Sequence, residues 1–259
     1  MLKIDALIDV FFKDLPLAER VSKIAECGYK YIETWQGGDA AILKSMANTG
    51  KSCGVEIVSV VLNSPGANET APVAKENLAV FVEQIDSYSD NALAAGCSQG
   101  IVTTGPAVGG RSYQEQRKAL VEALAIAGEK VASKGFKLNL EPLNLEVDHA
   151  GYFLECPKES VAIIKEIGLE NVKVLYDIYH MAIASGNLSV FIENNIEWIG
   201  HFHSAGVPGR HELFNGETNY PFILNAIEKT SYDGYFGLEY MPLLESGKSL
   251  RKTLNYLQG

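Results

Sequence analysis

Short apolar runs alternate with amphipathic stretches from one end of the chain to the other. Short runs rich in branched apolar side chains are typical of buried strands, whereas the stretches between them have the period of a helix with one apolar face. The pattern therefore predicts repeated strand-helix units. We expect eight strands, at roughly residues 3–8, 30–34, 55–61, 100–104, 137–141, 172–177, 199–203 and 235–239.

A helix is expected after each strand. The first begins at Pro16 and ends near Gly28, because Pro favours the first turn of a helix and Gly favours the position just past its end. The others are expected at about 41–51, 75–94, 112–134, 157–167, 187–194 and 221–230, followed by a terminal helix. A long polar loop around Pro65 and Gly66 follows the third strand. No shift in composition marks a boundary, so we predict one domain over residues 1–259.

The last four expected strands each end on a polar residue, namely Glu141, Asp177, His203 and Glu239. Their spacings of 36, 26 and 36 residues each correspond to about one strand-helix unit. Side-chain alternation along a strand turns their neighbours to the opposite face. These neighbours are apolar: Leu140, Tyr176, Phe202 and Leu238. Apolar side chains that face outward, with polar groups at the strand ends, predict a (β/α)8 TIM barrel with its active site at the C-terminal mouth.

Three carboxylates and one imidazole at this mouth predict a divalent metal site. Buried charges are costly unless they are paired or bound to a metal, so four such strand ends in succession are hard to explain as isolated charges. We expect Glu141, Asp177, His203 and Glu239 to be the ligands. A set rich in oxygen with one histidine favours Mg, Mn or Co and leaves positions open for two substrate oxygens.

Other polar and aromatic residues also lie near the expected mouth. Glu33 ends the second strand and Trp35 follows it, so the first could face the mouth and the second could form a wall of the pocket, or both could simply pack. His201 should point inward one layer below His203, which favours a core or supporting position over direct ligation. His149 and His211 lie in loops, where we assign them no role beyond a contact at the mouth.

Composition and charge limit the classes of partner. Hydrophobic residues make up 47% of the 259 residues, which is enough for a large core, and the formal net charge is -10. An acidic chain without a basic tract disfavours nucleic acid and anionic membranes as partners. Four scattered cysteines indicate neither a disulfide framework nor a zinc knuckle and fit a reducing compartment. Two aspartates near the N-terminus disfavour a signal peptide, so we expect a cytoplasmic enzyme with a small-molecule substrate.

Several motifs in the second half occur in the order and spacing of a known family. They are LEPLN, DHAGYFL, YDIYH, GNL, GHFH, PGRHE, GETNYP and GLEYMP. Over about residues 137–245 the chain resembles the hydroxypyruvate isomerases of the xylose-isomerase-like barrel superfamily, and the first half resembles them more loosely through phrases such as CGYKYIE. Barrels of this kind often pair, so the resemblance is compatible with a homo-oligomer.

The resemblance implies roles for individual residues. It implies that the four expected ligands surround a metal and that Glu141 and Glu239 face each other across the substrate as acid and base. Two opposed carboxylates can move a carbonyl between adjacent carbons through an enediolate. It also implies that His180, in an Asp-x-x-His element, contacts a substrate oxygen and that Arg210, in PGRHE, binds the substrate.

One residue departs from the family pattern. Many of these isomerases carry Gln where this chain has His203, whereas related ketose 3-epimerases carry His. An imidazole strengthens the metal prediction but leaves a ketose 3-epimerase as an alternative, because both reactions begin with proton removal beside a carbonyl. A non-catalytic sugar-binding barrel is a further alternative. Endonucleases with the same barrel use extra histidines from earlier strands, whereas here the first histidine is His149.

Overall fold

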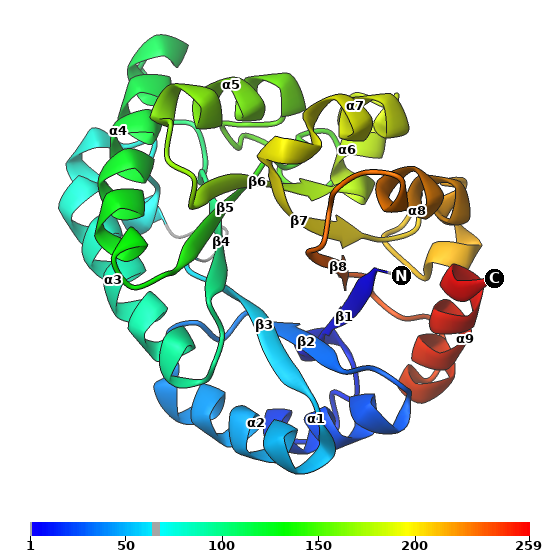
Figure 1. Cartoon of the computed structure of the whole chain (residues 1–259). Coiled ribbons are helices and arrows are strands. Elements are labelled where there is room, and N and C mark those ends of the chain that lie inside the picture. The colour runs from blue at the N-terminus through cyan, green and yellow to red at the C-terminus, as the bar shows by residue number, and fades with distance from the viewer. Residues whose placement is uncertain (1, 64–67) are drawn as a thin grey trace.

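Eight parallel strands close into a barrel in the computed structural model, which describes residues 2–63 and 68–259. Each strand pairs with the next, and β8 pairs with β1, so the sheet has no free edge (Figure 1). The strands are β1 (Lys3–Leu7), β2 (Tyr31–Thr34), β3 (Glu56–Val61), β4 (Gln99–Thr103), β5 (Lys137–Glu141), β6 (Val172–Asp177), β7 (Ile199–Ser204) and β8 (Tyr235–Leu238). The predicted barrel is therefore confirmed.

The helices form a ring outside the strands (Figure 1). They are α1 (Leu17–Glu26), α2 (Ala40–Cys53), α3 (Leu78–Ala94), α4 (Tyr113–Ala132), α5 (Pro157–Ile167), α6 (Ile178–Ala184), α7 (Leu188–Asn195), α8 (Tyr220–Glu228) and α9 (Ser246–Gln258). Short 3-10 turns join some of these elements, including one at Lys75–Asn77 that leads into α3. Across the described ranges, no helix has both the length and the apolarity that a membrane span requires.

The main core lies between the strands and the helices. Outward-facing residues of successive strands are fully buried there, among them Ile32, Val102, Leu140, Phe202 and Phe236. Burial of such side chains from water is the dominant favourable term in folding. Because outward positions alternate with inward ones, the same strands direct polar side chains into the barrel.

Local sequence signals set several helix ends. Ser112 and Glu115 form a reciprocal capping box at the start of α4, which satisfies two amide groups that the helix leaves free. Pro157 occupies the first turn of α5, and Gly168 ends that helix in a left-handed conformation. These signals explain why the predicted helix boundaries lie close to the observed ones. The loop expected around Pro65 and Gly66 falls partly outside the described residues, which omit 64–67.

One expected element was incomplete. The sequence pattern predicted a helix near 187–194 after the sixth strand, but α6 begins directly at the end of β6 and precedes α7. The side chain of Asp177 caps α6 by accepting hydrogen bonds from the amides of Tyr179 and His180. The sequence of α6 is too short to show a clear helical period. The cap formed by Asp177 stabilises the start of this helix and also fixes the direction of the Asp177 carboxylate.

Candidate active site

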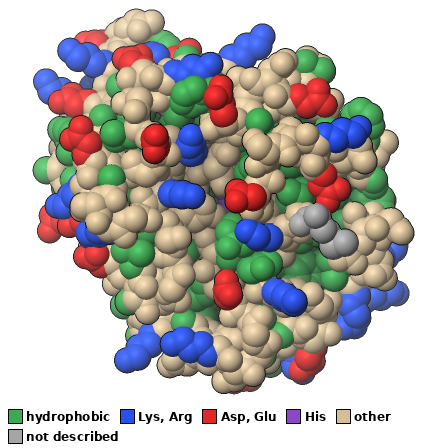
Figure 2. Space-filling view, viewed as in Figure 1, with side chains coloured by type: hydrophobic (Ala, Val, Ile, Leu, Met, Phe, Trp, Pro, Cys, Tyr) green, Lys and Arg blue, Asp and Glu red, His purple; other side chains and the backbone are tan. Residues whose placement is uncertain are grey.

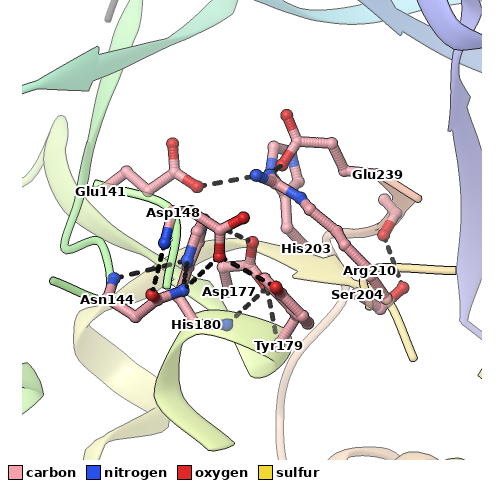
Figure 3. Close-up of polar contacts among 12 residues, drawn as sticks. Glu141, Asn144, Asp148, Asp177, Tyr179, His180, His203, Ser204, Arg210 and Glu239 are labelled. Carbon is pink, nitrogen blue, oxygen red and sulfur yellow. Dashed lines mark hydrogen bonds and ion pairs between the residues drawn. The ribbon is translucent and has the colours of Figure 1, made fainter. Parts of the chain in front are cut away.

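The four residues predicted as ligands lie together at the C-terminal ends of β5, β6, β7 and β8 (Figure 3). Nδ1 of His203 lies 3.3 Å from Oε2 of Glu239 and 3.6 Å from Oε1 of Glu141. One donor atom each from Glu141, Asp177, His180 and Glu239 falls within 4.8 Å of the others. Because the C-terminal ends of parallel strands meet at one mouth, residues far apart in sequence form one cluster.

This cluster fits a divalent cation. Oε1 of Glu141 and Nδ1 of His203 are buried atoms without a hydrogen-bond partner among the described residues. Buried polar atoms without a partner are costly unless an ion or a ligand satisfies them. Three carboxylates and one imidazole suit a hard or borderline cation, so the donor set agrees with the predicted metal.

The two carboxylate oxygens of Asp177 have different roles, one in capping a helix and one in the cluster at the mouth. Its Oδ1 caps α6, whereas its Oδ2 lies 3.5 Å from Nε2 of His180. Complete burial raises the pKa of Asp177 to about 7, although the nearby Arg210 and His203 oppose this rise. The metal-free protein therefore holds a carboxyl group whose charge is unfavourable until a cation joins it.

His180 is a hydrogen-bond donor in this arrangement. The side-chain oxygen of Asn144 accepts from the amides of Val147 and Asp148, which fixes its orientation and directs its Nδ2 toward Nδ1 of His180 at 2.6 Å. Nδ1 must then accept, so Nε2 carries the proton of the neutral ring. Burial lowers the pKa of His180 well below its usual value, which keeps the ring neutral. Nε2 is thus a buried donor without a hydrogen-bond partner among the described residues, although its position alone would also suit a metal ligand.

Arg210 lies over the cluster on the loop after β7 (Figure 3). Its guanidinium forms an ion pair with Oε2 of Glu239 and lies 5.3 Å from the centre of the Tyr179 ring. Its Nε is buried and has no hydrogen-bond partner in the described structure. Its backbone adopts φ 58°, a conformation that non-glycine residues rarely adopt. The fold thus directs the positively charged guanidinium of Arg210, with its unpaired Nε donor, toward the mouth.

Glu141 and Glu239 have opposite electrostatic surroundings. Burial raises the pKa of Glu141, and neither His203 nor Arg210 offsets this fully. Burial acts in the same direction on Glu239, but Arg210 and His203 outweigh it and hold the pKa of Glu239 below its usual value. Two carboxyl groups whose pKa values are pushed apart are suited to act as an acid and a base. Relative to a free glutamate, burial shifts the pKa of Glu141 toward retention of its proton, whereas Arg210 and His203 shift that of Glu239 toward ionisation.

A cavity of about 350 Å³ opens above these groups. Its polar lining includes Glu141, His203, Arg210 and Glu239. An apolar wall faces them, formed by Trp35, Val61, Ile101, Leu143 and Met241. Trp35 thus lines the pocket, and its Nε1 lies 3.5 Å from Oε1 of Glu239. A small concave site with a few convergent polar groups is typical of a binding site for a small molecule.

Comparison with known proteins decides the family. The model of the xylose isomerase-like TIM barrel family matches residues 21–258. The chain belongs to this family. It is 40% identical to the 2-oxo-tetronate isomerase of Cupriavidus necator over 141 residues, which span 54% of each chain. It is 27% identical to the hydroxypyruvate isomerase of Escherichia coli over 260 residues, 97% of this chain and 98% of that one.

A solved structure, an AP endonuclease of family 2 from Brucella melitensis, has the same fold as this xylose isomerase-like barrel. The TM-score is 0.89 at 27% identity, and 99% of each chain is covered. Together with the curated relatives, which are named isomerases, this confirms both the fold and the resemblance that the motifs of the second half indicate.

The structure also places the other polar residues that the sequence put near the mouth. Glu33 does not face the mouth; it lies inside the barrel, 2.9 Å from Nε2 of His203. Of the two loop histidines, His149 lines the cavity, whereas His211 binds the carbonyl of Met241 through Nδ1. His201 is fully buried below His203, as the alternation along the strand predicts.

Asn144 and Asp148 were not predicted from the sequence. Asn144 sets the tautomer of His180, and Asp148 accepts hydrogen bonds from Nδ2 of Asn144 and from the hydroxyl of Tyr179 (Figure 3). Both follow β5 within the motifs LEPLN and DHAGYFL. Their position just after β5 was the only sequence feature that pointed to them. The contact between this loop and α6 joins distant residues, so the local pattern of hydrophobic and polar positions does not reveal it.

The loop of this barrel that carries Arg210 is held by Glu212. The buried carboxylate of Glu212 accepts from the amides of Leu243 and Leu244 and from the hydroxyl of Ser249. We expect Glu212→Ala to lower the free energy of unfolding by about 2–5 kcal/mol, because it leaves two amides without a partner. Urea unfolding would measure this loss. Glu217→Ala, at an exposed position of the same loop, is the control and should change stability by under about 0.5 kcal/mol; equal losses in both variants would contradict the assignment.

Proposed function

We propose that this protein is an isomerase that moves a carbonyl group between adjacent carbons of a small 2-oxo acid. The first candidate reaction is the conversion of hydroxypyruvate to tartronate semialdehyde. One observation carries the proposal: Glu141 and Glu239 line one small cavity, with pKa values shifted in opposite directions. The names of the curated relatives support the same class of substrate, because hydroxypyruvate and 2-oxo-tetronate are both 2-oxo acids with a hydroxyl on the next carbon.

Glu141, Asp177 and Glu239, whose oxygens lie close together, would hold the divalent cation with Nδ1 of His203, which is close to Glu141 and Glu239. When bound, a cation of this kind stabilises negative charge that develops on adjacent substrate oxygens. The metal is expected to be Mg, Mn or Co, because oxygen donors dominate the set.

The two glutamates would transfer the protons. The ionised Glu239 takes the proton from the hydroxyl-bearing C3 of hydroxypyruvate, which gives an enediolate across C2 and C3. Glu141, favoured in its protonated form, then donates a proton to C2, while the hydroxyl proton passes from the C3 oxygen to the C2 oxygen. The product is an aldehyde at C3. Glu239 ends protonated and Glu141 ionised, so exchange with solvent must reset both groups before the next turnover.

His180 and Arg210 would orient the substrate. Nε2 of His180 offers a hydrogen bond to an oxygen on the reacting carbons, because Nδ1 is occupied by Asn144. The guanidinium of Arg210 can bind a carboxylate through its fork of donors, and its free Nε already lies in a buried position. A carboxylate bound by Arg210 would favour an oxo acid over a neutral ketose.

The alternatives predict different ligands and products. A ketose 3-epimerase could use the same cluster, and the imidazole of His203 is the feature that favours it. A non-catalytic barrel would bind a sugar without proton exchange. A nuclease would need a surface for a phosphate backbone, but the chain has a net charge of -10, and basic and acidic side chains are interspersed on the face in Figure 2.

Proton NMR in D2O tests the proposal. The protein is loaded with Mg2+, Mn2+ or Co2+ and incubated with hydroxypyruvate, 2-oxo-tetronate, fructose or tagatose; samples with a paramagnetic metal are read after its removal. We expect deuterium at C2 of the tartronate semialdehyde that forms, because Glu141 donates a solvent-derived deuteron there, and at C3 of the hydroxypyruvate that is regenerated through Glu239. Exchange at C3 of a ketose alone would instead establish an epimerase. Absence of exchange with every compound and metal would overturn the isomerase and leave a binding protein.

A further inference from the structure

A chain of buried polar groups runs through the barrel beneath the proposed metal site. It begins at Asn139 on β5 and passes through Gln99 on β4 and His201 on β7 to Glu33 on β2. At its end, His203 also contacts Glu33. All five side chains are buried. The proposed proton transfers do not use Asn139, Gln99, His201 or Glu33, so their place in the interior needs a separate explanation.

The hydrogen bonds along this chain have a fixed direction. Nδ2 of Asn139 donates to Oε1 of Gln99 at 3.5 Å, which leaves Nε2 of Gln99 as the donor to Nδ1 of His201 at 3.4 Å. With Nδ1 accepting, the neutral ring of His201 carries its proton on Nε2. That proton is donated to Oε2 of Glu33 at 3.1 Å. The polarity of the chain therefore makes Glu33 its final acceptor.

His203 donates to the same oxygen from the other side. Its Nε2 lies 2.9 Å from Oε2 of Glu33, whereas its Nδ1 is directed at Glu141 and Glu239 and has no hydrogen-bond partner among the described residues. Metal-binding histidines commonly donate their second ring N–H to a carboxylate, which fixes the tautomer and the orientation of the ring. Glu33 and His203 have this arrangement.

The surrounding backbone is shaped to allow the contact. Gly237 on β8 pairs with His203, and a Cβ at this position would lie 2.8 Å from Oε1 of Glu33 and 2.8 Å from Cδ2 of His203. A larger residue at 237 would therefore push the carboxylate and the imidazole apart.

We propose that Glu33 is a positioning residue that holds the proton of His203 on Nε2 and thereby presents the Nδ1 lone pair to the metal. His201, Gln99 and Asn139 orient the Glu33 carboxylate for this task. The inference rests on the proposed metal site and adds the group that prepares one of its ligands.

A competing explanation is that three of these buried residues bind a second cation beneath the proposed metal site. Glu33, His201 and His203 each offer an atom at suitable separations. The direction of the hydrogen bonds disfavours this, because both Nε2 atoms donate their protons to Glu33 and a cation bound there would have to displace both protons. The two hypotheses predict different metal stoichiometries, one ion for the positioning role and two for the second site.

Titration of the metal-free protein with Co2+ tests the role of Glu33 without any substrate. We expect one ion per chain and a visible absorption band that reports nitrogen ligation. Glu33→Gln should weaken Co2+ binding about 10- to 100-fold and alter the band. Gly237→Ala, which retains the Glu33 carboxylate but displaces it, should also weaken Co2+ binding. The matched control is Asp5→Asn, which removes a buried carboxyl group 4.0 Å from Nε2 of His201, with no hydrogen bond to either histidine; its affinity should stay within about threefold.

Nitrogen NMR of the unmodified protein provides a test that does not depend on whether the variants fold. With diamagnetic Zn2+ bound, the 15N shifts of His203 should show a protonated Nε2 and a metal-bound Nδ1. Ligation through Nε2, or a second bound ion, would overturn the proposal. So would a Glu33→Gln variant that folds and binds Co2+ as tightly as the unmodified protein.

These outcomes separate the positioning role from the proposed reaction. If the unmodified protein binds no divalent ion, both the metal site and the role of Glu33 fail. If it binds the ion through Nδ1 but converts no oxo acid, the positioning role stands and the proposed reaction falls. If it converts hydroxypyruvate while Glu33→Gln leaves the affinity and the absorption band unchanged, only the role of Glu33 is overturned.

Discussion

Glu141→Gln and Glu239→Gln are each expected to lower kcat for the isomerisation by about 10²–10⁴-fold, but with different patterns of deuterium exchange. Glu239 is favoured as the ionised base, so its replacement should abolish exchange at C3 of hydroxypyruvate in D2O. Glu141 is favoured as the acid, so its replacement should leave Glu239 able to take a proton and return a deuteron. Glu141→Gln should then label the substrate without forming product. Proton NMR of both variants measures exchange and turnover together.

Glu146→Gln is the control for this pair. Glu146 lies at an exposed position of the loop after β5 and receives the same change without contact with the cavity. Its kcat should remain within about twofold of the unmodified value, in keeping with the small effects of most surface changes. Exchange that survives in Glu239→Gln but disappears in Glu141→Gln would reverse the two roles, and full activity in both variants would remove them from the mechanism.

Asp177→Asn is expected to weaken metal binding while it stabilises the metal-free protein. Loss of a ligand should lower Mn2+ or Co2+ affinity by at least about 100-fold. Removal of a residue that only supports a ligand costs up to about 100-fold, and the loss of the ligand itself should cost no less. The pKa of Asp177 in the folded state is raised to about 7, above the usual value of a free aspartate. Between about pH 4 and pH 7 the folded state therefore holds a proton that the unfolded state releases, so this group lowers stability as pH rises through that window.

Asparagine removes the cost of the charge and can still cap α6. At pH 8 we expect the metal-free Asp177→Asn protein to gain about 2–4 kcal/mol in free energy of unfolding, with the gain disappearing near pH 4. Thermal and urea unfolding with a chelator at both pH values measure it. Asp39→Asn is the matched control, because Asp39 caps α2 through two amides at an exposed position. A loss of stability in Asp177→Asn at pH 8, or an equal gain in Asp39→Asn, would contradict the interpretation.

The sequence by itself determined the barrel and the residues at its mouth. Strand and helix periods are local properties, so eight alternating units were evident without contacts between distant residues. Glu141, Asp177, His203 and Glu239 were identified for the same reason, since parallel strands bring their C-terminal ends to one mouth. Local pattern also placed His201 one layer below His203, because side chains alternate along a strand.

Only the tertiary structure decided how these groups are prepared for chemistry. The contact between Glu33 and His203 joins β2 and β7, which are not neighbours in the sheet, and the tautomer of His180 depends on a loop that folds back against α6. The opposite pKa shifts of Glu141 and Glu239 arise from burial and from the position of Arg210, which lies on another loop. Sequence pattern indicates which face or end of an element a residue occupies, whereas tautomers, charge states and hydrogen-bond direction depend on atoms that meet only when the barrel closes.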